Sequence, residues 1–211
     1  MLRPMTSIDL KLSRLTVSRL LDGAERVAIV VLYIMMVHRF VGDLAAKPAN
    51  ILFILSEGLI AVMVLFRRGT EDISLRPVDW LTGVLGTALP MLYQPTGGGW
   101  AGGAMLMAAG LLISLGAKLS LRRSFGVVAA NRGVKRSGLY AAVRHPMYLG
   151  YLVTYIGALA VNPSAWNAVL LSVWLVFEVL RIFAEERILM QDEAYREHAA
   201  KVKFRLIPGV W

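Results

Sequence analysis

The sequence predicts an all-α integral-membrane protein of about six apolar helices, the last two forming a helical hairpin that follows a polar loop. Hydrophobic residues make up 57% of the 211 residues and charged residues only 18%. The mean hydropathy of +0.60 is too high for an ordinary soluble domain. The chain contains no cysteine, which excludes disulfides, thiolate metal ligands and a cysteine nucleophile.

The distribution of positive charge predicts the topology. Of the 23 Lys and Arg residues, 21 fall in segments that alternate with apolar runs, namely residues 1–26, 67–79, 118–144 and 181–211. With six crossings these segments share one side of the membrane, and only Arg39 and Lys47 lie on the other. The positive-inside rule then places both termini in the cytoplasm. Basic loops beside membrane spans also explain the net charge of +9, so no nucleic-acid partner is expected.

We expect three parts along the chain. Residues 1–24 are a basic amphipathic N-terminal segment, residues 25–121 hold four transmembrane helices, and residues 122–211 hold a signature loop, the hairpin and a C-terminal amphipathic helix. Within the first part, residues 7–21 alternate leucines with Lys and Arg, a pattern typical of a helix lying on the membrane surface. A disordered polar leader is the alternative. No apolar core of a signal peptide is present in this segment.

The four expected spans of the first half are residues 25–46, 50–66, 80–94 and 100–119. Arg39, near the far end of the first, is expected to reach the interface. Glu57 lies near the middle of the second, and we expect it to pair with His38 or Arg39 rather than to line a site. The fourth span carries Gly102, Gly103, Gly110 and Gly116, small residues that let membrane helices approach closely.

The longest polar interruption runs from Leu121 to Gly150 and ends in Arg-His-Pro-Met-Tyr-Leu-Gly. Pro146 suits the first position of a helix, because its φ fits and its missing N–H would be unpaired there. His145, which precedes a proline, becomes the boundary. The N–H groups at that helix start would suit an anionic group such as a carboxylate.

The second half continues with a short apolar helix over residues 147–161, a turn at Asn162-Pro163-Ser164, and a longer apolar helix over residues 165–183. The remaining tail, which begins at Glu185, is expected to be a charged amphipathic helix closed by Pro208-Gly209.

The string SGLYAAVRHPMYLGYL, followed by Arg181, the Glu185-Glu186 pair and Tyr195, resembles the isoprenylcysteine carboxyl methyltransferase family. That membrane family also includes phospholipid methyltransferases. The resemblance covers about the C-terminal half, from Leu119 onward. It implies an integral-membrane methyltransferase that uses S-adenosyl-L-methionine, with its active site facing the cytoplasm of a bacterial-type inner membrane or its equivalent.

The resemblance also implies roles for particular residues. Arg181 would bind the methyl acceptor, and Arg181 and Glu185 would be the catalytic pair. The expected cofactor contacts are Arg132, Gly133, Val134, Lys135, Tyr140, His145, Pro146, Met147, Tyr148 and Glu185. Methyl transfer from a sulfonium needs alignment and exclusion of water rather than an enzyme nucleophile, and no metal is expected.

The acceptor is expected to be lipophilic, either a small molecule or a lipidated chain that enters from the membrane lipids. Methylation of a carboxylate oxygen is favoured. The alternative acceptors are a phospholipid amine and a small thiol. The alternative protein classes are a reductase of related architecture and a non-catalytic membrane protein or transporter that retains the fold. A transporter would predict inverted repeats, which the sequence lacks.

Several of these residues also have plain structural interpretations. Arg181 and Glu185 are spaced i,i+4 and suit a helix-surface ion pair. Glu178, Glu185 and Glu186 suit the solvated end of a span. Tyr151 and Tyr155 suit an interfacial aromatic belt, and that is the role we expect for them.

Overall fold

In the computed structural model the described chain is a bundle of helices, with no strand among the residues it describes. Residues 1–6, 67–75 and 122–132 lie outside the described part. The helices are α1 (Ser7–Val41), α2 (Asn50–Phe66), α3 (Pro77–Ala88), η1 (Leu89–Leu92), α4 (Gly103–Leu121), η3 (Gly138–Ala141), α5 (Pro146–Val161), α6 (Ala165–Leu189) and α7 (Glu193–Lys201). The predicted all-helical class is thereby confirmed.

Within the described residues, two helices are long and apolar enough to cross a membrane, namely α4 and α6. The apolar helices α2 and α5 are shorter, at 17 and 16 residues. At about 1.5 Å per residue, α5 is shorter than a hydrocarbon core of about 30 Å. The number of membrane crossings therefore stays a prediction, and the structure supports a membrane protein with at least these two candidate spans.

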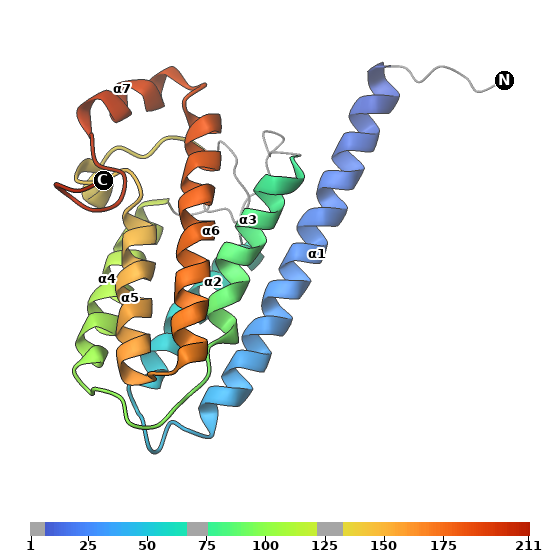
Figure 1. Cartoon of the computed structure of the whole chain (residues 1–211). Helices are drawn as coiled ribbons and strands as arrows, with labels where there is room; N and C mark the ends of the chain where they lie inside the picture. Colours follow the sequence, from blue (N-terminus) through green and yellow to red (C-terminus); the bar gives the residue numbers. More distant parts are fainter. Residues whose placement is uncertain (1–6, 67–75, 122–132) are drawn as a thin grey trace.

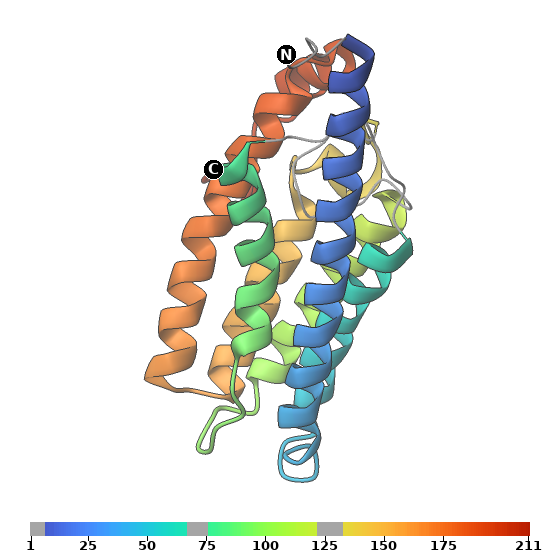
Figure 2. The same ribbon diagram turned by 90° about the vertical axis from the view of Figure 1, so that its right-hand side faces the viewer.

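The helices α1 to α6 lie side by side along one long axis (Figures 1 and 2). The start of α5, η3 and α7 gather at one end, which we call the signature end (Figure 1). The Ser7 end of α1 also lies toward this end. Only three residues separate α5 from α6, and the two helices run in opposite directions.

The first helix differs from the expectation of a surface helix followed by a separate span. Residues 7–21 and the start of the expected span belong to one continuous helix, α1. An ion pair of 2.8 Å between Arg26 Nε and Asp22 Oδ2 bridges one turn across the expected break. Gly23 alone does not end the helix, because a single glycine costs only about 1 kcal/mol in a helix interior.

Helices α4 and α5 pack closely against each other along their length. A Cβ atom added at Gly103 would lie 2.6 Å from Gly157 O, and one added at Gly110 would lie 2.5 Å from Gly150 O. The four glycines therefore let the two backbones touch along their length. The expected role of small residues in this span is confirmed at Gly103 and Gly110.

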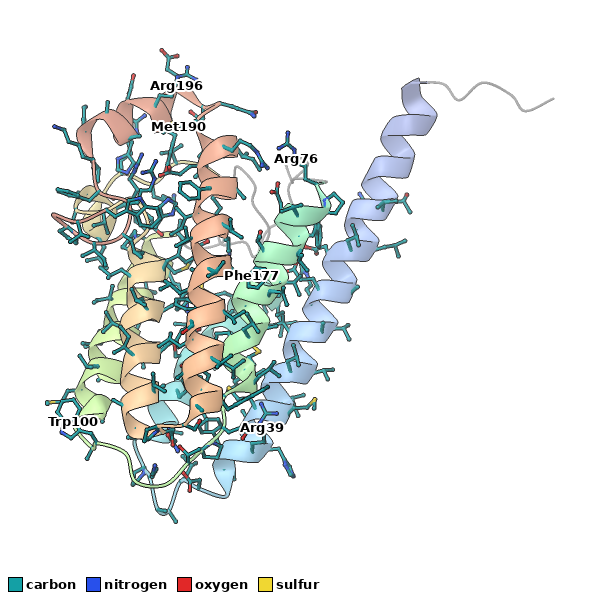
Figure 3. All side chains as sticks on the ribbon, in the orientation of Figure 1. Arg39, Arg76, Trp100, Phe177, Met190 and Arg196 are labelled. Atoms are coloured by element: carbon teal, nitrogen blue, oxygen red, sulfur yellow. The ribbon has the colours of Figure 1, made fainter. Side chains whose placement is uncertain are left out.

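The end opposite the signature end is fixed by polar side chains rather than by charge pairs. Arg39 donates to Met91 O, and Lys47 donates to Thr96 O and, at 2.7 Å, to Val161 O. Both basic residues of this end thus bind backbone carbonyls. Figure 3 shows Arg39 and Trp100 near this end, and Met190 and Arg196 near the other.

The expected pair between Glu57 and His38 or Arg39 is wrong. Glu57 is fully buried and accepts a hydrogen bond of 2.9 Å from Tyr155 Oη. Arg39 lies two residues before the end of α1, whereas Glu57 lies seven residues into α2. This difference in depth is about 8 Å along the helix axis, which places Glu57 inside the bundle and Arg39 near its end.

Candidate active site at the signature end

The start of α5 is held by the C-terminal segment of the chain. The backbone N–H of Arg144 donates to Phe204 O at 3.0 Å, and that of His145 donates to Arg205 O at 2.8 Å. His145 is the N-cap of α5, with φ −125° and ψ 57°, and Pro146 occupies the first turn. The predicted boundary at His145-Pro146 is confirmed, although the imidazole makes no capping hydrogen bond.

The N–H groups at this helix start are mostly engaged. Tyr148 and Leu149 both donate to His145 O at 3.2 Å, and Pro146 has no N–H to give. In the described part of the chain, Met147 N–H is the first-turn donor that remains for a ligand. The helix start therefore offers one backbone donor, together with the dipole of α5, rather than the open set expected.

Glu186 is the centre of a buried polar network. It accepts from Arg205 Nε at 2.8 Å and lies 3.2 Å from Arg144 Nε. His145 Nε2 lies 3.3 Å from Glu186 Oε1, and Tyr195 Oη donates to that oxygen at 3.5 Å. Burial, followed by the charge of Glu186, raises the pKa of Tyr195, so its phenol stays a donor. Glu186 thus fixes the C-terminal segment and the imidazole to α6.

Glu185, its neighbour, keeps more of its carboxylate open. Its side chain is 18% exposed, against 7% for Glu186. Tyr148 Oη donates to Glu185 Oε1, and His145 Nδ1 lies 3.8 Å from Oε2. The rings of His145 and Tyr148 stack at 5.6 Å with planes 8° apart. The structure therefore gathers three of the predicted site residues, His145, Tyr148 and Glu185, around one carboxylate.

Arg181 lies one turn deeper and is enclosed. Its side chain is 3% exposed, with Nε 3.5 Å from Glu185 Oε1 and Nη1 3.8 Å from Glu178 Oε1. The guanidinium also lies 5.0 Å from the Tyr148 ring centroid, and Nη1 donates to Thr87 Oγ1 of α3 at 3.5 Å. The i,i+4 pair considered from the sequence is present, but inside the bundle rather than on its surface.

The loop before α5 supplies the other predicted cofactor contacts. Tyr140 is buried in η3, and burial, followed by the charges of Glu185 and Tyr195, raises the pKa of its phenol. Val134 and Lys135 are half-buried, and Gly133 is exposed with φ 96°. Arg132 lies outside the described residues. The roles of residues 132–135 stay predictions.

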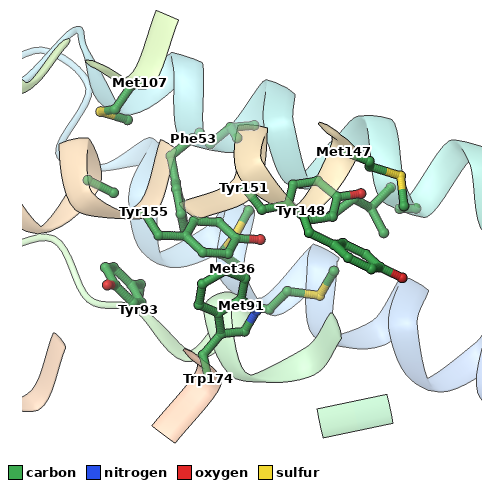
Figure 4. Packing of buried hydrophobic residues seen from close by; sticks show 14 of the residues in the cluster. Met36, Phe53, Met91, Tyr93, Met107, Met147, Tyr148, Tyr151, Tyr155 and Trp174 are labelled. Carbon is green, nitrogen blue, oxygen red and sulfur yellow. The ribbon is translucent and has the colours of Figure 1, made fainter. Parts of the chain in front are cut away.

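Two expectations for nearby side chains are wrong. Tyr151 and Tyr155 are 4% and 1% exposed, so they do not form an interfacial belt. Figure 4 shows Tyr148, Tyr151 and Tyr155 in succession along α5, among core residues such as Trp174. A period of three to four residues puts all three on one helix face, and this face points inward.

Glu178 and Glu186 are also not a solvated helix end, since they are 2% and 5% exposed. Arg205 and Thr87 were not anticipated. Arg205 lies in an irregular tail and Thr87 in an apolar helix, so neither position carries a local sequence signal for this contact.

A comparison with known families bears on this site directly. Residues 100–197 match the family model described as phospholipid methyltransferase. The match begins just before α4 and ends within α7, so it includes His145, Tyr148 and Glu185. No curated protein matches the chain. The matched stretch, which contains the α5–α6 site, is thus similar to the phospholipid methyltransferase family, in agreement with the resemblance of the signature stretch.

Proposed function

We propose that the protein is an S-adenosyl-L-methionine-dependent methyltransferase that acts on a lipophilic acceptor from the bilayer. The observation that carries the proposal is the contrast within the Glu185-Glu186 pair. Both carboxylate oxygens of Glu186 are already engaged by neighbouring side chains at the start of α5. Glu185 keeps a partly exposed carboxylate beside Tyr148 and His145. An accessible carboxylate beside a remaining backbone donor suits a ligand that carries both an ammonium and a carboxylate.

The residues present fit such a cofactor. Met147 N–H and the α5 dipole would hold its carboxylate, and Glu185 its ammonium. Tyr148, stacked on His145, would supply an aromatic wall. Residues 132–135 and Tyr140 would contact the rest. When bound, the cofactor supplies a methyl group on a sulfonium. The protein's part is to align the acceptor and keep water away.

The charges around Arg181 bear on the acceptor. Arg181 was expected to grasp an acceptor carboxylate, but its guanidinium already lies between Glu178 and Glu185 and against the Tyr148 ring. An acidic acceptor would compete with two carboxylates there. The two carboxylates carry more negative charge than the single guanidinium neutralises, and they lie beside the Tyr148 ring. This surrounding instead suits a positively charged amine. We therefore favour N-methylation over the carboxylate O-methylation expected from the sequence.

An ammonium acceptor must lose a proton before it can attack a methyl group. Glu178 is the candidate base, because its carboxylate is buried beside Arg181 and neither oxygen accepts a hydrogen bond from another described residue. Burial opposes the ionised form of Glu178, whereas the charge of Arg181 on the same helix favours the carboxylate that would receive the proton.

A product analysis tests both parts of the proposal. The full chain, purified in detergent, is incubated with methyl-labelled S-adenosylmethionine and a bacterial lipid extract, with Glu185→Gln as the matched inactive variant. We expect label in the lipid phase for the wild type and a large loss in the variant. Labelled methanol released by mild base marks an ester and a carboxylate acceptor, whereas label that withstands mild base excludes an ester, as N-methylation predicts. An absence of transfer by the wild type contradicts the methyltransferase proposal, and equal transfer by the wild type and Glu185→Gln contradicts the role of Glu185.

A further inference from the structure

A second set of polar side chains lies deeper in the bundle, below the site at the signature end. We call it the inner polar cluster: Glu57 of α2, Lys118 of α4, and Tyr151 and Tyr155 of α5. Glu57 is 0% exposed and Lys118 is 2% exposed. Lys118 Nζ lies 4.7 Å from the Tyr151 ring centroid. Tyr151 in turn lies 6.1 Å from Tyr148, centroid to centroid. The cluster is therefore close enough to Tyr148 for one lipid headgroup to contact both.

Most of the hydrogen-bonding capacity of this cluster is unused. Among the residues that the structure describes, its one hydrogen bond between side chains runs from Tyr155 Oη to Glu57 Oε1. Among the described residues, no partner satisfies Lys118 Nζ, Tyr151 Oη or Glu57 Oε2. A buried ammonium without a partner is among the most costly groups a protein can hold, above all within a membrane span. Such groups are a functional-site hypothesis by default.

A simple ion pair between Lys118 and Glu57 does not account for the cluster. The two charges attract each other, but in the described chain neither a hydrogen bond nor an ion pair within 4.0 Å joins them. The open groups are unequal in kind. Lys118 and Tyr151 offer N–H and O–H donors, and Glu57 offers one acceptor oxygen. A ligand that satisfies them brings anionic oxygens and one donor of its own.

We propose that Lys118 binds the phosphate of a membrane lipid headgroup, with Tyr151 as a second donor and Glu57 receiving a donor that the same headgroup carries. An ammonium is a compact point charge that suits phosphate. Lys118 lies three residues before the end of the candidate span α4, at the depth where lipid headgroups meet the apolar core, which makes a lipid the source of that phosphate. That this lipid is the methyl acceptor rests on the proposed function. The anion site itself does not.

The test uses purified full chain in a neutral maltoside detergent, without cofactor. Dioctanoyl phosphatidic acid is the probe, dioctanoylglycerol is the matched lipid without phosphate, and inorganic phosphate represents a free anion. Binding is measured by calorimetry and by the shift in unfolding temperature. The variants are Lys118→Met, Glu57→Gln and, as the control, Lys201→Met, which removes an exposed lysine of α7.

We expect the wild type and Lys201→Met to bind the phosphatidic acid with the same affinity, and neither to bind dioctanoylglycerol. Lys118→Met should lose affinity by at least about tenfold, the range for one charge-assisted hydrogen bond. Glu57→Gln should bind at least as tightly as the wild type, because it removes a nearby negative charge. Without ligand, Lys118→Met should unfold no earlier than the wild type, since it removes a buried ammonium that makes no hydrogen bond within the described residues.

Equal affinity of the wild type and Lys118→Met for the phosphatidic acid overturns the proposal. Inorganic phosphate that stabilises as strongly as the lipid overturns the lipid source. A loss of stability in both Lys118→Met and Glu57→Gln, with unchanged lipid affinity, makes the pair structural and contradicts the proposal. Cofactor binding is measured separately in all variants. If cofactor binding is intact in all variants and the affinity for the lipid is the same with and without Lys118, the lipid-phosphate site is contradicted and the proposed function stands.

Discussion

Replacing Glu186 by glutamine should destabilise the protein far more than its position beside Glu185 suggests. Glu186 lies within 3.3 Å of Arg205, Arg144 and His145. The substitution keeps the shape but removes the charge, and it leaves the Arg144 side chain, 6% exposed, as a buried cation without its carboxylate. Breaking a buried pair costs about 3–5 kcal/mol. Because the Arg205 side chain is 30% exposed, solvent screening lowers this to about 2–4 kcal/mol.

For a chain of this size each kcal/mol moves the unfolding temperature by roughly 2–4 °C, so Glu186→Gln should unfold about 4–16 °C below the wild type. The assay is thermal unfolding of the purified protein in one detergent, followed by circular dichroism. Glu197→Gln is the matched control. It removes a carboxylate whose ion pair with Arg136, at 3.1 Å, is exposed on both sides, and it should cost less than about 1 kcal/mol. If the two variants unfold at the same temperature, the network around Glu186 does not hold the start of α5.

Three further predictions follow from packing, charge and topology. Gly110→Leu should prevent the close packing of α4 on α5, because even its Cβ would lie 2.5 Å from Gly150 O. We expect a sharp fall in expression and in unfolding temperature. Gly116→Ala is the control and should be tolerated, because its Cβ meets only a Leu139 methyl at 3.2 Å. Burial, followed by the charges of Arg136, Arg144 and His145, lowers the pKa of His198. The unfolded state therefore binds its proton more tightly, stability falls as the pH drops below about 6.5, and His198→Gln should flatten that fall in unfolding curves between pH 7.5 and 5.5. Tags at residues 1 and 211 should both be inaccessible from outside intact cells, as six crossings and the positive-inside rule require, and a tag at Trp211 that is labelled from outside contradicts that topology.

The sequence was informative where the signal is local. Pro146 fixes φ and lacks an N–H, so the boundary at His145 follows from two adjacent residues. Asn50–Phe66 agrees with the second predicted span residue for residue. The all-helical class followed from apolar runs of helical length. The first two elements were separated wrongly, because a change in polarity at residue 24 marks a change of surroundings and not the end of a helix.

Long-range contacts account for most of what the sequence left open. Glu185 and Glu186 are adjacent and chemically alike, and the approach of Arg144, His145 and Arg205 determines that Glu186 is the more fully engaged of the two. Tyr151 and Tyr155 resemble an aromatic belt until the neighbours of α5 show that their face is internal. Arg181 suggested capture of an acid, and its enclosure depends on the packing of α6 against α3, which brings Thr87 to it, and against α5, which brings Tyr148.

The account depends most on the claim that Glu185, at the start of α5, binds S-adenosylmethionine. The direct measurement is a calorimetric titration of the purified full chain with this cofactor, comparing the wild type with Glu185→Gln and with Glu197→Gln. We predict saturable binding by the wild type and by Glu197→Gln, and an affinity at least about tenfold weaker in Glu185→Gln, as expected for one lost charge-assisted contact. Wild-type affinity in Glu185→Gln, with the variant folded, would contradict the site, and an absence of binding by the wild type would contradict the proposed function itself.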